Sequence, residues 1–190
     1  GRLLRHAEVF GRLAATLDVR QHSSRMLAAI APWVGGDGDA LEAMDEAERA
    51  TRIATVLDGP TMPSPDSVGV RDDELVRTFT ELGRGIRTYG QGAAGKVIVS
   101  FTRLPSDVLA AQTLARIGGL IRSDGDVVAS DVDIVPLFES IEDLRRAPDT
   151  LRQLFSAPAY ARNLAARGDA QTVMVGYSDS NKDGGYLAAN

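Results

Sequence analysis

Short apolar runs recur along the chain, each with a charged or hydroxyl residue at or just past its C-terminal end. They predict buried strands at residues 13–20, 96–101, 133–139 and 172–179. Helical periodicity follows the second run, beginning after Pro105 and stopping near Gly118. Two shorter helices are expected between the third and fourth runs, interrupted before Pro148 and again near Pro158. Alternation of strands and helices predicts parallel strands joined by crossovers, and therefore an α/β fold.

The interval between the first two runs departs from this alternation. It contains no convincing strand, and its periodicity predicts helices at residues 23–34, 39–57 and 70–88, with a proline-rich surface loop at 58–69. We therefore expect an all-helical insertion at about residues 22–95, between the first two strands of a parallel sheet.

Composition narrows the class of protein. The 190 residues are 44% hydrophobic and 25% charged, which is typical of a globular protein, and no apolar stretch approaches the roughly 20 residues of a transmembrane helix. We expect a cytoplasmic protein without membrane association. The net charge of −5 and the scattered arginines argue against a nucleic-acid surface. Because cysteine is absent, a bound metal would depend on oxygen ligands or on His6 and His22, which favours a hard cation.

Two carboxylates stand at the predicted ends of successive strands. Glu139 ends the run at 133–139, and Asp179 ends the run at 172–179. If these strands are parallel neighbours, both carboxylates lie at one edge of the sheet, where they suit Mg²⁺ or Mn²⁺ with water filling the remaining positions. The alternative is that each acid caps the helix that follows it.

Two cations accompany these carboxylates. Lys182 falls close to the expected first turn of a helix, where a positive charge opposes the helix dipole, and a bound anion would explain it. The alternative is a solvated lysine beside Asp183. Arg20 ends the first predicted strand, where its guanidinium could bind a carboxylate or phosphate with two hydrogen bonds. The alternative is a salt bridge to Asp18 or to an acid on a neighbouring strand.

Other residues are weaker candidates. Arg103 is a possible addition to the site, whereas Ser106 and Asp107 fit helix caps. His6 is expected on the exposed face of an amphipathic helix, and His22 is expected to be structural. The glycines at 90–95 precede a strand, whereas a dinucleotide-binding loop follows one.

The tail Val173-Met-Val-Gly-Tyr-Ser-Asp-Ser-Asn-Lys-Asp-Gly-Gly185 resembles the second active-site signature of phosphoenolpyruvate carboxylases. Three further stretches are similar to that family in the same order. They are Leu17-Asp-Val-Arg-Gln21, Ser100-Phe-Thr-Arg-Leu-Pro-Ser-Asp-Val-Leu109 and Val135-Pro-Leu-Phe-Glu-Ser-Ile-Glu-Asp-Leu144. Together the stretches extend over nearly the whole chain.

The resemblance implies a carbon–carbon lyase with a (β/α)8 TIM-type barrel, of which residues 1–190 form part of a single domain. The implied reaction joins phosphoenolpyruvate to bicarbonate through carboxyphosphate and pyruvate enolate, giving oxaloacetate and phosphate with Mg²⁺ or Mn²⁺. By matching motifs, Glu139 and Asp179 would bind the metal and Arg20 would hold phosphoenolpyruvate. Lys182 would help to place bicarbonate. The family also implies a homotetramer.

The sequence departs from the family in one place, since His22 stands where an acid is usual. The family's histidine motif and its glycine- and arginine-rich loop are not found among these residues, so we expect a central segment of a longer enzyme, inactive alone. One rival is another metal-dependent barrel enzyme acting on phosphoenolpyruvate or pyruvate. A second rival is a non-catalytic barrel scaffold, although a scaffold has no need of Arg20, Glu139, Asp179 and Lys182 together.

Overall fold

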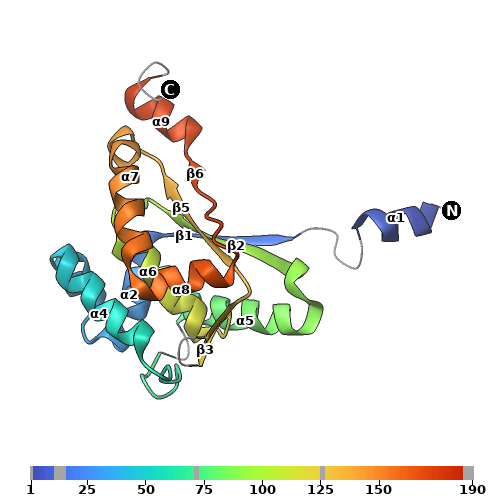
Figure 1. Ribbon diagram of the computed structural model, residues 1–190, viewed down its shortest axis with the longest axis horizontal. Helices are drawn as coiled ribbons and strands as arrows, with labels where there is room; N and C mark the ends of the chain where they lie inside the picture. Colours follow the sequence, from blue (N-terminus) through green and yellow to red (C-terminus); the bar gives the residue numbers. More distant parts are fainter. Residues whose placement is uncertain (1, 11–15, 71–72, 125–126, 186–190) are drawn as a thin grey trace.

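A four-stranded parallel sheet forms the centre of the computed structural model, which describes residues 2–10, 16–70, 73–124 and 127–185 (Figure 1). The strands follow the order β1 (Leu17–His22), β2 (Ala94–Ser100), β5 (Asp133–Phe138) and β6 (Met174–Val175). Each neighbouring pair is parallel. The predicted α/β fold with parallel strands is therefore confirmed.

The two faces of the sheet have different surroundings. Val97, Val99 and Ile134 belong to the main core, which they share with the helices. The opposite face carries a small cluster of Ile98, Val135 and Leu137. Because β2 and β5 are buried on both faces, their sequences are apolar at nearly every position.

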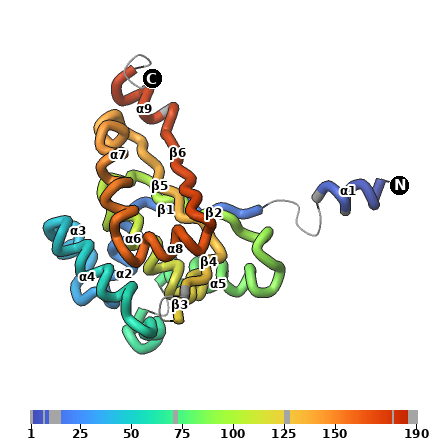
Figure 2. The backbone as a smooth tube through the Cα atoms, in the orientation of Figure 1, coloured from blue at the N-terminus to red at the C-terminus, as the bar shows by residue number. Residues whose placement is uncertain are grey.

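Helices connect the strands, and most of them surround the main core, whereas the first and the last helix lie away from it (Figure 2). Their bounds are α1 (Arg2–Phe10), α2 (Ser23–Val34), α3 (Gly38–Ala43), α4 (Glu46–Asp58), α5 (Glu74–Tyr89), α6 (Pro105–Ile117), α7 (Ile141–Ser156), α8 (Pro158–Ala166) and α9 (Tyr177–Gly184), with a 3-10 turn η1 (Gln91–Ala93). Helices α2 to α5 lie between β1 and β2 in the chain. Helix α6 contacts α2, α4, α5 and α7, and most of its residues are buried as a result. None of the described helices is long and apolar enough to span a membrane.

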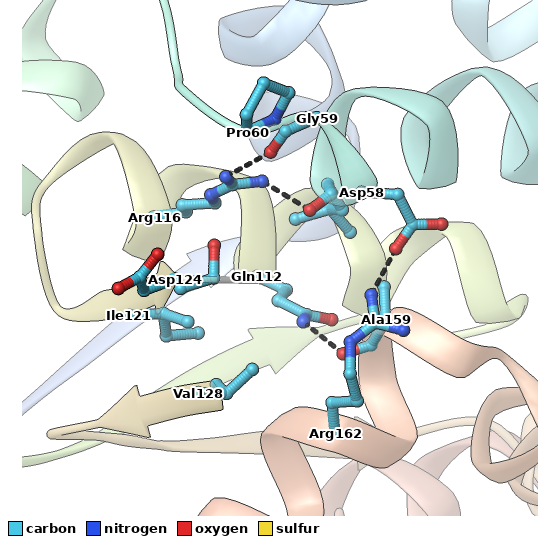
Figure 3. A pocket seen from close by; sticks show the side chains of 12 residues that line it. Asp58, Gly59, Pro60, Gln112, Arg116, Ile121, Asp124, Val128, Ala159 and Arg162 are labelled. Atoms are coloured by element: carbon cyan, nitrogen blue, oxygen red, sulfur yellow. Dashed lines mark hydrogen bonds and ion pairs between the residues drawn. The ribbon is translucent and has the colours of Figure 1, made fainter. Parts of the chain in front are cut away.

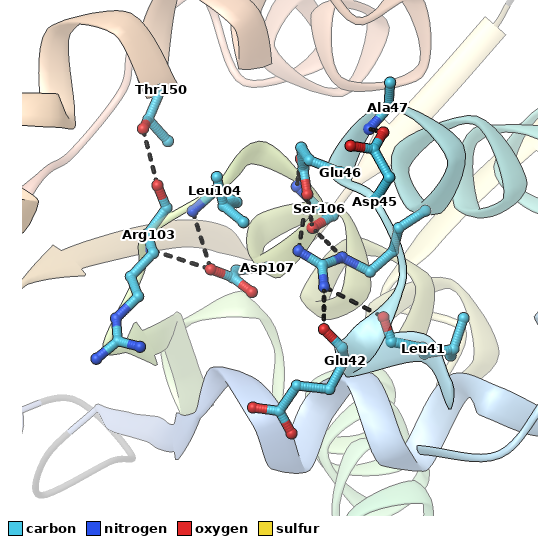
Figure 4. Close-up of polar contacts among 11 residues, drawn as sticks. Leu41, Glu42, Asp45, Glu46, Ala47, Arg103, Leu104, Ser106, Asp107 and Thr150 are labelled. Atoms are coloured by element: carbon cyan, nitrogen blue, oxygen red, sulfur yellow. Dashed lines mark hydrogen bonds and ion pairs between the residues drawn. The ribbon is translucent and has the colours of Figure 1, made fainter. Parts of the chain in front are cut away.

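The start of α6 is fixed by a charged network from α4 (Figure 4). Arg49 is only 4% exposed and donates to Ser106 Oγ at 2.8 Å and to Glu46 Oε2 at 2.8 Å. Glu46 in turn accepts from Ser106 N and Oγ at 3.0 and 2.6 Å. Asp107 Oδ2 accepts from the backbone N–H groups of Arg103 and Leu104, and burial raises the pKa of this carboxyl above its ordinary value. Asp107 therefore caps α6, as predicted, whereas the Ser106 side chain contacts Arg49 and Glu46 and does not cap the helix.

Two predicted helix boundaries were wrong. The helix expected at 39–57 is divided into α3 and α4, because Met44 is extended and Asp45 caps α4 by accepting from Ala47 N at 2.9 Å. The expected break before Pro148 is absent, since α7 continues through this residue. Pro148 is exposed, and its missing N–H leaves the carbonyl of Leu144 without its usual partner in the helix.

The strand expected at 172–179 was also wrong. Its paired part is only Met174–Val175, and the chain enters α9 at Tyr177. Gly176 donates its N–H to Phe138 O at 2.9 Å and is the last residue held against β5. The first strand also differs, since β1 runs to His22, and residues 13–15 of the prediction lie outside the described residues.

A hairpin follows α6 that the periodicity did not predict. It consists of β3 (Ile121–Asp124) and β4 (Val127–Ser130), which pair antiparallel. The sequence contained a signal for it, because Gly125-Asp126 between two short runs with β-branched residues is typical of a two-residue hairpin connection.

Candidate active site

Side chains from three strands meet at the carboxyl edge of the sheet. Arg20 on β1 pairs in register with Ile98, so the Arg20 side chain lies on the same face as Ile98 and Ser100 of β2. Glu139 follows β5 and completes the group. Arg20 Nε donates to Ser100 Oγ at 2.6 Å, and Arg20 Nη2 donates to Glu139 Oε1 at 2.5 Å. We call these three residues the Arg20 cluster.

The guanidinium of Arg20 keeps unused donors. A guanidinium has five N–H groups, and the described contacts of Arg20 engage one on Nε and one on Nη2. The Arg20 side chain is 54% exposed, so its remaining edge is open to solvent. An open pair of N–H groups on a fixed guanidinium matches the oxygens of a carboxylate or phosphate.

Glu139 differs from Arg20 because it is buried. The residue is 3% exposed, and Oε2 has no hydrogen-bond partner among the described residues. A buried carboxylate oxygen without a partner is costly, so this atom suits an added cation or donor. An oxygen ligand of this kind fits Mg²⁺ or Mn²⁺, which take few protein ligands and keep several waters. Within the ranges that the structure describes, no three His, Asp or Glu side chains form a metal cluster.

The two other predicted site residues lie on α9. Asp179 is in the first turn and Lys182 in the last turn, and both are exposed. The expectation that Lys182 opposes the dipole of its helix was therefore wrong, because a cation is favoured near a helix C-terminus. Neither side chain makes a hydrogen bond or ion pair with another residue of the described chain. The structure thus joins Arg20 to Glu139 and leaves Asp179 and Lys182 available on the adjacent helix.

Residues beside the Arg20 cluster shape its rim. Phe101 adopts a left-handed conformation with φ of 54°, and its ring stacks on His22 with centroids 4.7 Å apart. His22 Nδ1 accepts from Ser24 N at 3.2 Å and so caps α2, in agreement with the structural role expected for it.

His6 is exposed on α1, as predicted. Arg103 forms an ion pair with Asp143, with Nε 3.7 Å from Oδ1, and has no described contact with the Arg20 cluster.

Ser100 is the member of the cluster that sequence reasoning missed. The sequence feature that could have identified Ser100 is a hydroxyl at the last position of a buried strand. In the structure Ser100 pairs with His22 at the end of β1. The alternative suggested for Arg20, a salt bridge to an acid at another strand, is present as its contact with Glu139. Since only part of the guanidinium is used, this salt bridge and anion binding are compatible.

A separate hollow of about 230 Å³ lies beside the β3–β4 hairpin (Figure 3). Its cations already have partners. Arg116 donates to Val56, Leu57 and Gly59 carbonyls at the end of α4, and Arg162 pairs with Asp58. Among the described residues that line this hollow, no buried carboxylate oxygen lacks a partner, in contrast to Glu139 in the Arg20 cluster.

The fold and the Arg20 cluster define an α/β protein in which an arginine with unused donors and a buried carboxylate oxygen without a described partner lie at the carboxyl edge of a parallel sheet. Enzymes of this class place their sites at this edge. Comparison with known proteins is more specific. The sequence profile of the phosphoenolpyruvate carboxylase family matches residues 1–190. The chain belongs to this family.

Named relatives agree with the family match. A phosphoenolpyruvate carboxylase of Xanthomonas euvesicatoria is 42% identical over 99% of this chain and 20% of its own length. The enzyme of Roseiflexus castenholzii is 39% identical over 99% of this chain and 20% of its own length. The enzyme of Corynebacterium diphtheriae is 40% identical over 95% of this chain and 20% of its own length. The chain thus spans about one fifth of the length of these relatives.

Proposed function

We propose that the whole protein carboxylates phosphoenolpyruvate with bicarbonate to give oxaloacetate and phosphate. The observation that carries this proposal is the Arg20 cluster, in which an open guanidinium edge adjoins a buried carboxylate with an unpartnered oxygen. An anion and a cation would be bound side by side there. Phosphoenolpyruvate with a divalent metal is such a combination, and the family of this chain is named for that substrate.

Each residue has a defined role in this proposal. Arg20 holds the phosphate or carboxylate of phosphoenolpyruvate, with Ser100 and Glu139 fixing the plane of its guanidinium. Glu139 and Asp179 hold Mg²⁺ or Mn²⁺, which supplies Lewis-acid stabilisation of negative charge. Lys182, an exposed ammonium on the same helix as Asp179, helps to place bicarbonate.

The proposed chemistry proceeds in two stages. A bicarbonate oxygen attacks phosphorus, the bond from phosphorus to the enol oxygen breaks, and carboxyphosphate and pyruvate enolate result. Carboxyphosphate releases carbon dioxide and phosphate, and the enolate carbon then attacks carbon dioxide to form oxaloacetate. Arg20 offsets the negative charge that moves from phosphate to enolate, and exclusion of water protects the enolate from protonation.

The architecture of the whole protein is part of the proposal. The parallel sheet has β1 and β6 at its edges, and both edges would be extended by strands from the rest of the chain. We propose that residues 1–190 are part of one (β/α)8 barrel, with residues 22–95 as a helical insertion. A homotetramer remains a prediction from the family resemblance, and a cytoplasmic location remains a prediction from the sequence.

The test uses the full-length protein. Oxaloacetate formation should require phosphoenolpyruvate, bicarbonate and a divalent metal, and ¹⁸O from labelled bicarbonate should appear in the released phosphate, because bicarbonate oxygen attacks phosphorus. Arg20→Lys keeps the charge but loses the planar fork, so it should raise the KM for phosphoenolpyruvate about 10-fold or more. Arg25→Lys, a nearby exposed arginine, is the matched control.

The rival functions give different results. Turnover of phosphoenolpyruvate that is independent of bicarbonate would favour a phosphotransferase or another carbon–carbon lyase. An inactive full-length protein that also fails to bind Mn²⁺ would favour a scaffold. Either result would contradict the proposed carboxylation.

A further inference from the structure

Helix α9 is attached to the segment around Glu139 by three contacts from different residues. Gly176 N donates to Phe138 O at 2.9 Å. Ser180 Oγ lies 2.8 Å from the backbone carbonyl oxygen of Glu139 and 2.7 Å from that of Gly176, and its single hydroxyl hydrogen is shared between these two acceptors. Asp183 Oδ2 accepts from Ile141 N at 3.0 Å. Figures 1 and 2 show α9 beyond the end of β6 and next to the start of α7, where these contacts lie.

The contacts separate two faces of α9. Ser180 is 1% exposed, and with Asp183 three residues later it forms the face that touches the Glu139 segment. Asp179 and Lys182 are also three residues apart, on the neighbouring face, and are exposed. Residues at this spacing lie one turn apart on a helix. Ser180 and Asp183 therefore hold the helix that carries Asp179 and Lys182 against the segment of Glu139.

Asp183 accepts a hydrogen bond from a backbone N–H group at the start of α7 that the capping box of this helix leaves without a partner. Ser140 Oγ accepts from Asp143 N at 3.0 Å, and Asp143 Oδ2 accepts from Ser140 N at 3.2 Å, which forms the local capping box of α7. Ile141 N is another unpaired donor of the first turn, and Asp183 reaches it from α9. A carboxylate at the start of α7 also interacts favourably with the helix dipole.

We propose that Ser180 and Asp183 are positioning residues of the active site, which dock α9 so that Asp179 and Lys182 stand beside Glu139. This inference rests on the proposed function, because it takes Asp179 as a metal ligand and Lys182 as a bicarbonate contact. Neither positioning residue touches substrate or metal. Each acts through the backbone of the segment that contains Glu139.

The experiment compares variants of the full-length protein. Ser180→Ala and Asp183→Ala should each accelerate amide hydrogen exchange in α9 and weaken Mn²⁺ binding about 10- to 100-fold, as loss of outer-shell partners does. Turnover, kcat, should fall, whereas the KM for phosphoenolpyruvate should change much less, because Arg20 does not depend on α9. Asp183→Asn should restore most of the activity, since its amide oxygen can accept from Ile141 N.

Asp73→Ala is the matched control. Asp73 caps α5 through Leu75 N and Val76 N, so its loss should destabilise a helix without changing Mn²⁺ affinity. Unchanged α9 exchange in Ser180→Ala and Asp183→Ala would overturn the docking, and accelerated exchange with wild-type Mn²⁺ affinity and kcat would overturn the positioning role. If the wild-type protein makes no oxaloacetate, the proposed function fails, and hydrogen exchange still decides whether the two residues dock α9.

Discussion

Replacing Gly176 with alanine tests how closely the last strand must approach Glu139. The backbone of Gly176 has φ of −81°, so alanine meets no left-handed strain. The difficulty is space, because a Cβ at this position would lie 3.1 Å from Glu139 Cα and 3.2 Å from Glu139 Cγ. Ordinary contacts of a Cβ begin near 3.4 Å, and one of the two atoms is backbone, so Gly176 and Glu139 must separate by about 0.3 Å.

The cost of Gly176→Ala follows from this displacement. Overpacking of a tight site destabilises by about 1–3 kcal/mol. The displaced residue also accepts the 2.5 Å hydrogen bond from Arg20 and is the proposed metal ligand. We therefore expect Mn²⁺ affinity to fall about 10- to 100-fold, which corresponds to about 1.4–2.7 kcal/mol of binding free energy.

Mn²⁺ titration of the full-length protein, followed by electron paramagnetic resonance, measures this effect, with kcat/KM for phosphoenolpyruvate as a second readout. Gly85→Ala is the matched control, because a Cβ there has no heavy atom within 4 Å and the residue is inside α5. That change should stabilise the helix by up to about 1 kcal/mol and leave the metal affinity unchanged. A wild-type Mn²⁺ affinity in Gly176→Ala would refute the argument that this glycine is required for space.

Two further predictions concern the stability of the fold. Arg49→Met should destabilise α4 and the start of α6 by about 3 kcal/mol, because Glu46 and two carbonyls lose a buried partner. The control Arg52→Met, at an exposed pair with Glu48, should cost less than about 1 kcal/mol. Local hydrogen exchange measures both variants, and equal effects would contradict the stabilising role of the Arg49 network. The hydrogen bond from Arg122 lowers the pKa of Asp131 in the folded protein. The ionised Asp131 carboxylate therefore stabilises the fold above its unfolded pKa near 3.8, and this stabilisation is lost as pH falls through the lowered folded pKa. The difference in thermal stability between wild type and Asp131→Asn should therefore shrink from about pH 6 to about pH 3, and a constant difference would contradict it.

The sequence predicted β2, β5 and α6 well because these elements are buried on nearly all sides. Their apolar runs admit few alternatives, and Pro105 marks the start of α6. Residues 172–179 misled the same reasoning. Their apolar run continues past the two residues that pair with β5, and only the tertiary contacts of Gly176 and Ser180 decide where the strand gives way to α9.

The candidate site was predictable to a different extent for each residue. Arg20 and Glu139 could be found because Arg20 lies two residues before the end of β1 and Glu139 directly follows β5, and parallel strands bring such positions to one edge. The exact contact between them could not be found, since it depends on strand order, with β2 between β1 and β5. The place of Lys182 within its helix was missed because the helix begins at Tyr177, earlier than the sequence indicated.

These differences divide the site into two parts with unequal support. Arg20 and Ser100 belong to strands paired along their length, and Glu139 directly follows a third, so hydrogen bonds of the sheet fix their backbones. Asp179 and Lys182 belong to a short helix that follows a strand of two residues, and its described side-chain hydrogen bonds to the sheet edge and α7 come from Ser180 and Asp183. Rigid strands hold geometry better than short helices do. Changes at α9 should therefore affect metal and bicarbonate steps before they affect binding of phosphoenolpyruvate at Arg20.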